Sequence, residues 1–191
     1  MKKYPQNPRI ARVIITLKCL CSCHYCCNKY ETIMSNAVEI SNIAKMDMCD
    51  ILCITGGEPM LDPDKTLKII ALAKRINPSL IIYLYTAWFS EQLPEIIDAV
   101  DGIHFTLHSN ANNKDIDNFQ RFQEMLREYA DKSFRLYINS NIKRPITIYP
   151  YLWKRVETKP WLSEETLLAV QPNGLPKNEA LYIKIKYLFT N

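Results

Sequence analysis

Four cysteines lie within one eight-residue stretch, Cys19-Leu-Cys-Ser-Cys-His-Tyr-Cys26, and this stretch constrains the fold more than any other. Cys19, Cys23 and Cys26 have the spacing C-x3-C-x2-C, which is too tight and uneven for one face of a helix or a strand. The stretch therefore predicts a loop whose thiolates converge on zinc or on an iron-sulfur cluster.

The spacing favours a cluster over zinc only in part. Structural zinc sites often combine two separated C-x2-C pairs, and Cys49 and Cys53 do not provide the second pair. Three ligands from one loop suit a [4Fe-4S] cluster in which one iron has no protein ligand. The alternative is a non-catalytic module in which the same triplet and either Cys27 or His24 hold structural zinc. Cys21, Cys27, Cys49 and Cys53 are expected to be small buried hydrophobic residues rather than ligands, although Cys21 and Cys27 lie close enough to the triplet to be tested as ligands.

A second motif follows the cysteine stretch. Residues 51–55, Ile-Leu-Cys-Ile-Thr, form a short apolar segment that predicts a buried strand, and Gly56-Gly57-Glu58-Pro59 comes directly after it. The glycines allow a close approach of backbone to a ligand, and Glu58 can pair with an ammonium group. Pro59 stiffens the segment that leaves the strand.

Together the two motifs resemble the radical S-adenosylmethionine (radical SAM) superfamily. The resemblance rests on residues 19–26 and 56–59, and it implies that Cys19, Cys23 and Cys26 ligate a [4Fe-4S] cluster. It implies further that S-adenosylmethionine (SAM) chelates the open iron, that residues 56–59 cradle its amino group, and that Tyr25 lies near its adenine.

The same resemblance implies an enzyme. An external one-electron donor of the flavodoxin or ferredoxin type reduces the cluster, and reductive cleavage of SAM gives a 5′-deoxyadenosyl radical that abstracts hydrogen from a substrate. The substrate is a peptide or protein, or a small molecule. No cysteine follows Cys53, so auxiliary clusters held by this chain's own thiols are not expected.

Composition limits the remaining possibilities. The chain has 191 residues, enough for one domain, and its 48% hydrophobic and 23% charged content is that of a globular protein. Seven cysteines without a secretion signal indicate a cytoplasmic protein, and no apolar segment is long enough for a membrane span. The net charge of +4 does not favour nucleic acid as a partner. Residues 132–191 carry ten Lys and Arg against four Asp and Glu, which indicates either a solvated face or a site for an anionic substrate.

The rest of the chain alternates short β-branched segments with amphipathic ones. A loose leader covers residues 1–9, and residues 143–191 are less regular. Strands are predicted at 12–16, 51–55, 80–85, 103–107 and 134–138, with further strands at 167–170 and 181–189. Helices are predicted from Ser35 through Ala44, from Pro63 to Asn77, from Ser90 to Val100, over 113–130, and irregularly over 151–156.

This alternation predicts an α/β fold, a partial open (βα)5–6 barrel with a parallel sheet. Ligands of such folds gather at the carboxyl ends of the strands. That rule predicts further SAM contacts from Thr86, Ser109, Asn139 and the backbone of residues 170–172, although each of these side chains also suits a turn or a strand end. His108 lies at the same edge and is the candidate for moving a proton or touching substrate.

Overall fold

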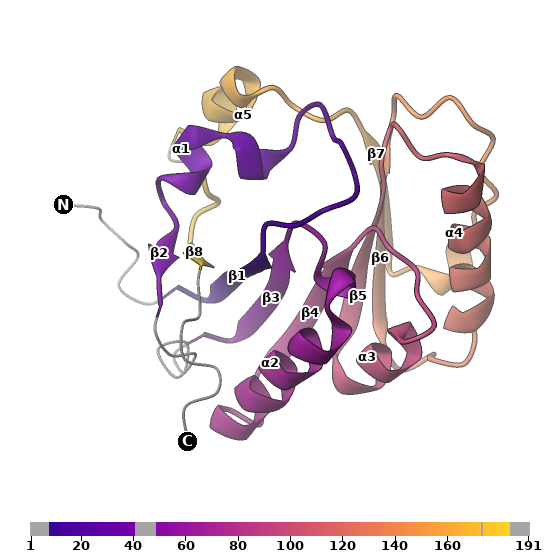
Figure 1. Ribbon diagram of the computed structural model, residues 1–191, viewed down its shortest axis with the longest axis horizontal. Coiled ribbons are helices and arrows are strands. Elements are labelled where there is room, and N and C mark those ends of the chain that lie inside the picture. The colour runs from indigo at the N-terminus through magenta and orange to yellow at the C-terminus, as the bar shows by residue number, and fades with distance from the viewer. Residues whose placement is uncertain (1–7, 41–48, 173, 184–191) are drawn as a thin grey trace.

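The chain folds around one parallel sheet. The computed structural model describes residues 8–40, 49–172 and 174–183. Eight strands lie in the order β2-β8-β1-β3-β4-β5-β6-β7, and every neighbouring pair is parallel (Figure 1). The predicted α/β class with an open parallel sheet is confirmed, and the arrangement is compatible with a partial barrel.

The five strands predicted before residue 140 match observed strands closely, whereas β2 was not predicted. Their bounds are β1 Ile10–Thr16, β2 Val38–Glu39, β3 Ile51–Gly56, β4 Ile81–Thr86, β5 Gly102–Leu107, β6 Ser133–Asn139, β7 Arg155–Lys159 and β8 Glu179–Ile183. β8 comes from the far end of the described chain and inserts between β1 and the short edge strand β2.

Helices connect most of the strands. They are α1 Glu31–Met34, α2 Pro63–Ile76, α3 Leu93–Ala99, α4 Asn113–Leu126 and α5 Glu164–Val170, with short 3-10 turns at Cys27–Lys29, Pro59–Leu61 and Pro150–Leu152. Asp62 caps α2, since its carboxylate accepts a hydrogen bond from the Lys65 N–H at 3.1 Å. Asn112 and Asp115 form a reciprocal capping box at the start of α4.

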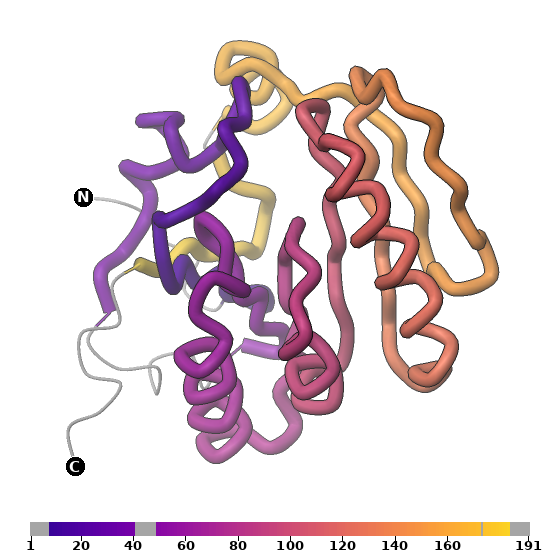
Figure 2. The backbone as a smooth tube through the Cα atoms, turned by 45° about the vertical axis from the view of Figure 1, so that its right-hand side comes forward, coloured from indigo at the N-terminus to yellow at the C-terminus, as the bar shows by residue number. Residues whose placement is uncertain are grey.

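The main core lies between the sheet and helices α2, α3 and α4. These three helices follow one another along the same side of the sheet, as the tube in Figure 2 shows. The strand residues that point toward them are apolar and fully buried, Ile54, Leu84 and Phe105 among them. Because side chains alternate along a strand, the residues between them point to the opposite face.

The helix predicted from Ser35 is wrong over the residues that the structure describes. α1 ends at Met34, and Ser35 lies at its C-terminal end rather than capping a new helix. Residues 38 and 39 form the edge strand β2, because β8 offers them an edge of unpaired backbone groups. Residues 41–48, which include most of the remainder of the predicted helix, lie outside the described residues.

Two further predictions fail after residue 140. The irregular helix predicted over 151–156 is instead a 3-10 turn, Pro150–Leu152, followed by strand β7, which pairs with β6. The strand predicted over 167–170 is part of helix α5, whose N-cap Ser163 accepts a hydrogen bond from the Thr166 N–H. The expectation that residues 170–172 end a sixth strand falls with it.

Smaller corrections concern helix ends. The helix predicted from Ser90 begins at Leu93, and the one predicted to reach Ala130 ends at Leu126. The C-terminal strand is confirmed as β8 up to Ile183, and its predicted continuation to residue 189 lies outside the described residues.

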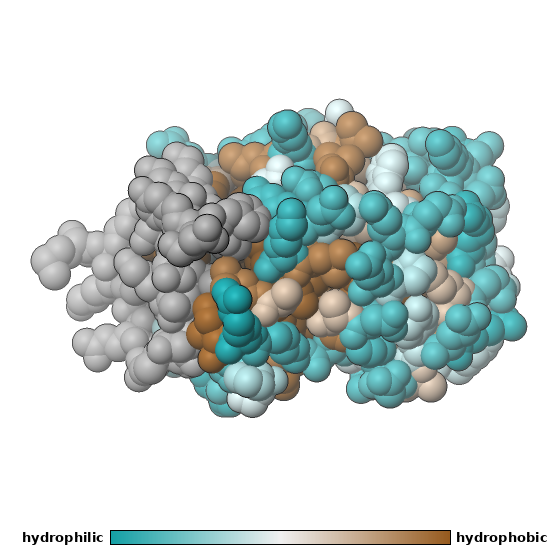
Figure 3. Space-filling model, turned by 60° about the horizontal axis from the view of Figure 1, so that its bottom comes forward, coloured by the Kyte–Doolittle hydropathy of each residue, from teal (hydrophilic) through white to brown (hydrophobic). Residues whose placement is uncertain are grey.

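The last two observations concern the surface and the helices. Seen from the end where the strands begin, hydrophilic side chains surround a patch of apolar surface (Figure 3). Within the described part of the chain, no helix is both long enough and apolar enough to span a bilayer.

Candidate functional site

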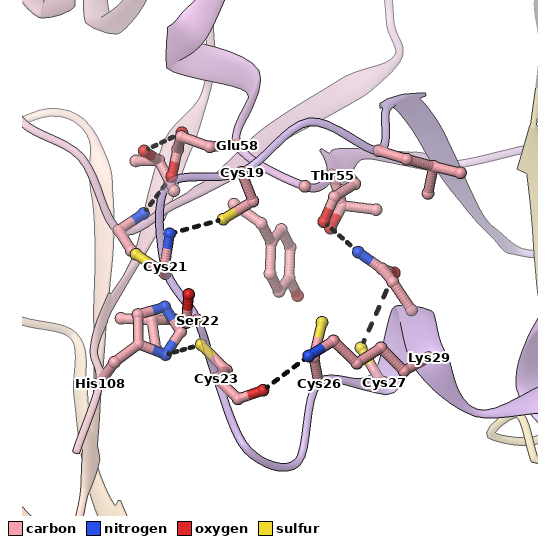
Figure 4. A pocket seen from close by; sticks show the side chains of 18 of the residues that line it. Cys19, Cys21, Ser22, Cys23, Cys26, Cys27, Lys29, Thr55, Glu58 and His108 are labelled. Atoms are coloured by element: carbon pink, nitrogen blue, oxygen red, sulfur yellow. Dashed lines mark hydrogen bonds between the residues drawn. The ribbon is translucent and has the colours of Figure 1, made fainter. Parts of the chain in front are cut away.

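A cavity of about 460 Å³ lies at the carboxyl edge of the sheet. Its walls come from the loop after β1 and from the ends of β3, β4 and β5. Five of the seven cysteines line it, together with Gly56 and Gly57 (Figure 4). Its size lies within the range of ligand sites in proteins, roughly 300–1,000 Å³.

Backbone hydrogen bonds join the cysteine loop to the glycine segment. The Gly57 N–H donates to Thr16 O at 2.7 Å, and the Glu58 N–H donates to Lys18 O at 2.8 Å. From the far end of the loop, Asn28 Nδ2 donates to Gly56 O at 2.6 Å. Both ends of the cysteine loop are therefore attached to the end of β3.

The two glycines are needed for this attachment. A Cβ on Gly57 would lie 2.1 Å from Lys18 O, and a Cβ on Gly56 would lie 2.2 Å from Thr16 O. Gly56 also has a φ of +137°, which residues with a side chain rarely adopt. The motif thus has a structural reason as well as a possible ligand-binding one: it lets the cysteine loop lie directly on β3.

The predicted triplet lines one cavity. Cys19, Cys23 and Cys26 all contribute to its walls, and Figure 4 shows them around a shared space. Cys19 Sγ accepts a hydrogen bond from the Cys21 N–H at 3.3 Å. Lys29 Nζ donates to Cys23 O at 3.4 Å, which places a cation beside the loop.

The other four cysteines divide into two pairs. Cys49 and Cys53 are buried in the fold, as expected of small hydrophobic residues. Cys21 is half-buried and Cys27 is exposed, and both line the cavity, so the expectation of burial is wrong for this pair.

The cavity disfavours free thiolates. Burial, with a contribution from neighbouring thiol groups, raises the pKa of Cys21 to about 12 and that of Cys23 to about 11. Several thiolates in one cavity repel one another unless a positive charge lies between them. A metal ion or cluster provides such a charge, because metal coordination deprotonates a thiol.

Thiols are the usual ligands of a [4Fe-4S] cluster, and three of them come from one loop of this cavity. Among the described residues, no group of three His, Cys, Asp or Glu side chains is placed to hold one metal ion. A [4Fe-4S] cluster binds each thiolate to a different iron, so its ligands stand farther apart than those of one zinc ion. Cys19, Cys23 and Cys26 line one cavity, so the ligands that such a cluster would need face a common space.

Glu58 is a buried acid in the cavity wall. Its Oε1 accepts hydrogen bonds from the Met60 N–H at 2.9 Å and from Thr86 Oγ1 at 2.7 Å, and its Oε2 accepts one from the Ala87 N–H at 2.9 Å. Its side chain is almost fully buried, and burial raises its pKa. A carboxylate has about four acceptor positions, so three protein donors leave room for one more. A bound ammonium group would favour the ionised form.

His108 also lies in the cavity wall. Its Nδ1 is 3.3 Å from Cys23 Sγ, and its ring lies 5.4 Å from that of Trp161. Burial lowers the pKa of His108 to about 4, so the ring is neutral at neutral pH. A neutral imidazole can donate one hydrogen bond and accept another without adding charge to the cavity.

Several predicted contacts do not line the cavity. Tyr25 is 38% exposed and packs against the ring of His24 instead. Pro59 is buried at the start of a 3-10 turn, and Ser109 is exposed in the turn after β5. Asn139 is buried, and its side chain accepts a hydrogen bond from the Asn141 N–H, so it ends strand β6. Of the residues predicted from strand ends, Thr86 and His108 line the cavity.

Sequence reasoning missed several residues of the cavity wall. Thr55, Tyr85 and Thr106 are each the residue before the last of a strand, in β3, β4 and β5. Trp161 comes from the segment after β7. The three strand residues share a signal that was available, because each lies at the carboxyl end of a predicted parallel strand. Trp161 had no such signal, since its segment crosses over the sheet edge.

No protein-family model matches this chain, and no curated protein matches it at a significant level.

Proposed function

We propose that this chain is a radical SAM enzyme. In this proposal Cys19, Cys23 and Cys26 hold a [4Fe-4S] cluster, and SAM binds in the cavity beside Gly56 and Gly57. The observation that carries the proposal is that the cysteine triplet and the glycine motif, about 30 residues apart in the chain, line the same cavity.

Each wall of the cavity has a separate part in binding. The thiol groups supply three anionic ligands from one loop, and the glycine segment brings backbone polar groups close to a ligand. The Glu58 carboxylate is held by three protein donors and has capacity for an ammonium group. A ligand with an amino group therefore finds a preorganised acceptor next to the thiols.

Other residues of the cavity wall limit the access of water and provide a neutral imidazole. Tyr85 and Trp161 place aromatic rings in its walls, which helps to exclude water from a bound ligand. His108 is neutral and within hydrogen-bond reach of a thiol, so it can hold a proton near the substrate without repelling a positively charged cofactor.

The cofactors supply the hard chemistry. A cluster held by Cys19, Cys23 and Cys26, reduced by a flavodoxin- or ferredoxin-like donor, would supply one-electron reductive cleavage of SAM to methionine and a 5′-deoxyadenosyl radical, which would abstract hydrogen from a peptide, protein or small-molecule substrate. The protein's own residues bind, orient and shield the reacting groups.

Anaerobic reconstitution tests the proposal. The chain purified with iron and sulfide, then reduced in the presence of SAM, is expected to form 5′-deoxyadenosine and methionine, detected by chromatography. Cys23→Ala should lose both cluster and products, whereas Cys49→Ala, which removes a buried thiol away from the cavity, should retain them. A wild-type protein that carries a reduced cluster and forms neither product would contradict the proposal.

Metal analysis separates this function from the structural zinc alternative. A cluster protein is brown and contains about four iron atoms per chain when fully loaded, in keeping with its [4Fe-4S] composition. A colourless protein with one tightly bound zinc would support the non-catalytic module instead.

A further inference from the structure

The sheet has a second face that carries charged and aromatic side chains. Arg12, Tyr83, Tyr85, His104 and Arg135 occupy the alternate positions of β1, β4, β5 and β6, opposite the apolar residues that pack on the helices. All five are half-buried. Partial burial of such side chains costs desolvation free energy, so their charges and polar atoms should have partners.

One of its two arginines has an acidic partner. Arg12 forms an ion pair with Glu179 and lies over the ring of Tyr85. Its charge is therefore compensated inside the protein.

Arg135 is different. Its guanidinium lies 4.6 Å from the centre of the Tyr83 ring, and Nη2 donates to the Tyr83 hydroxyl at 3.3 Å. Among the described residues no carboxylate forms an ion pair with it. A guanidinium has five N–H donors in a planar fork, so most of its donors are available to a ligand.

His104 lies beside Arg135. The two residues are direct neighbours in the pairing of β5 with β6, and both point to the same face. His104 Nδ1 is buried and has no hydrogen-bond partner within the described part of the chain. A buried polar atom without a partner indicates a group that is absent from the protein itself.

The charges around His104 favour an anion at this place. Burial is the largest cause that lowers the pKa of His104 to about 4, and the charges of Arg135, Arg12 and Lys159 contribute to the same shift. Glu157 acts in the opposite direction. Glu157 forms ion pairs with Arg155 and Lys159, which leaves Arg135 without an acidic partner among the residues that the structure describes.

We propose that Arg135 and His104 bind an anionic group, a carboxylate or a phosphate, of the molecule on which this protein acts. A planar guanidinium can hold two oxygens of either group, and the imidazole can bond a third polar atom or one of the same oxygens. The anion supplies both the missing charge and the missing hydrogen-bond partner.

The position fits a substrate that reaches into the cavity. Thr106 lines the cavity and lies two residues farther along β5 than His104, about 7 Å at the usual rise of a strand. Tyr85 lines the cavity and its ring lies 4.6 Å from that of His104. A molecule anchored by its anion at Arg135 would thus reach the cavity wall at Thr106 with atoms about 7 Å away. The inference deepens the proposed function by naming its substrate class.

Anion titrations test the site without turnover. Inorganic phosphate and, separately, acetate are titrated into the anaerobically purified chain, and side-chain NMR signals of Arg135 Nε–H and the His104 ring are followed. At least one of the anions should shift both signals saturably. Saturation by phosphate alone or by acetate alone would identify which anionic group the site accepts.

Matched arginine variants locate the binding. Arg135→Gln should weaken binding by at least about tenfold, the usual effect of losing a charged hydrogen-bond donor. Arg121→Gln removes another arginine stacked on a ring, 4.9 Å from the centre of Phe89, on the helix side of the sheet, and should leave binding unchanged. Arg135→Lys keeps the charge without the fork and should fall between wild type and Arg135→Gln, which provides a second measurement if Arg135→Gln folds poorly.

The outcome is independent of the radical chemistry. Absence of saturable shifts with both anions, or binding that Arg135→Gln leaves intact, would overturn the anion site even if SAM is cleaved. Failure of SAM cleavage with normal anion binding would overturn the proposed enzyme and leave the anion site in place.

Discussion

The two faces of the sheet differ in what their side chains contact. The face toward α2, α3 and α4 presents Ile54, Leu84 and Phe105, all fully or almost fully buried. The opposite face presents Arg135 and His104, of which the first lacks an acidic partner and the second a hydrogen bond for Nδ1, within the described residues. We infer that the helix side provides stability, whereas the polar side gives up stability for binding.

The largest loss of stability should come from a substitution on the helix side of the sheet. Phe105→Ala removes a ring that is 1% exposed and lies 4.7 Å from the ring of Phe122, so unfolding in urea should show a loss of about 3–5 kcal/mol. Tyr83→Ala, an aromatic truncation on the polar face, should cost less than half as much, since that ring is only half-buried. Equal losses from the two variants would contradict the division between the faces.

The next largest effect is a pH dependence of stability, which comes from His104 on the polar face of the sheet. The pKa of His104 is lowered from its usual value to about 4 in the folded protein, chiefly by burial. The unfolded chain therefore binds a proton first, and stability should fall as pH drops from about 6.5 toward 4, by on the order of 3 kcal/mol in total. His104→Gln should remove this part of the pH dependence in urea unfolding measured across that range. A variant that keeps the full wild-type slope would show that His104 is not its source.

The third prediction concerns the edge where the faces meet. Gly57→Ala places a Cβ 2.1 Å from Lys18 O, so the cysteine loop must shift, with an expected loss of about 1–3 kcal/mol and of iron binding on reconstitution. Gly102→Ala is the matched variant, because its Cβ would meet Ser133 O at the same 2.1 Å, but Gly102 does not line the cavity of the cysteine loop. It should destabilise the fold and still bind iron. Normal iron content in Gly57→Ala would show that the loop does not need this contact.

The smallest effect should be that of Arg135 on stability. Its stacking on Tyr83 stabilises the fold by about 0.5–1 kcal/mol. The free energy of unfolding of Arg135→Gln should therefore lie within about 1 kcal/mol of that of the wild type. Arg121→Gln, which also loses an exposed ion pair with Glu91, should behave alike. A loss of several kcal/mol for Arg135 alone would mean that it supports the fold rather than a ligand.

Much of the fold could be predicted because the early strands are apolar on the helix side. Residues 51–56 and 102–107 have β-branched or aromatic side chains and are bounded by turn residues, and both form strands. The cap at Asp62 likewise marks the start of α2.

The later elements were mispredicted for identifiable reasons. Strand β7 lies at the edge of the sheet and reads Arg-Val-Glu-Thr-Lys, so it lacks the apolar residues of an inner strand. The apolar residues 167–170 predicted a strand by composition, although Ser163 with Glu164 and Glu165 is a typical helix start. Tertiary pairing, which a single sequence does not display, decided the first case.

The candidate site was predicted in part. The cysteine loop and the glycine segment meet because both follow adjacent parallel strands, β1 and β3. Trp161, Arg135 and His104 were not predicted, since their proximity depends on the register of β5, β6 and β7. Short-range spacing reveals ligands on one loop, whereas a sheet face is assembled from distant segments.

Electron paramagnetic resonance of the reduced, reconstituted chain, recorded with and without SAM, tests the central claim most directly. If Cys19, Cys23 and Cys26 hold a [4Fe-4S] cluster with one iron open to SAM, addition of SAM should change the signal of the reduced cluster, and Cys23→Ala should have no such signal. A cluster signal that SAM leaves unchanged, or a zinc-loaded protein with no signal, would contradict the account.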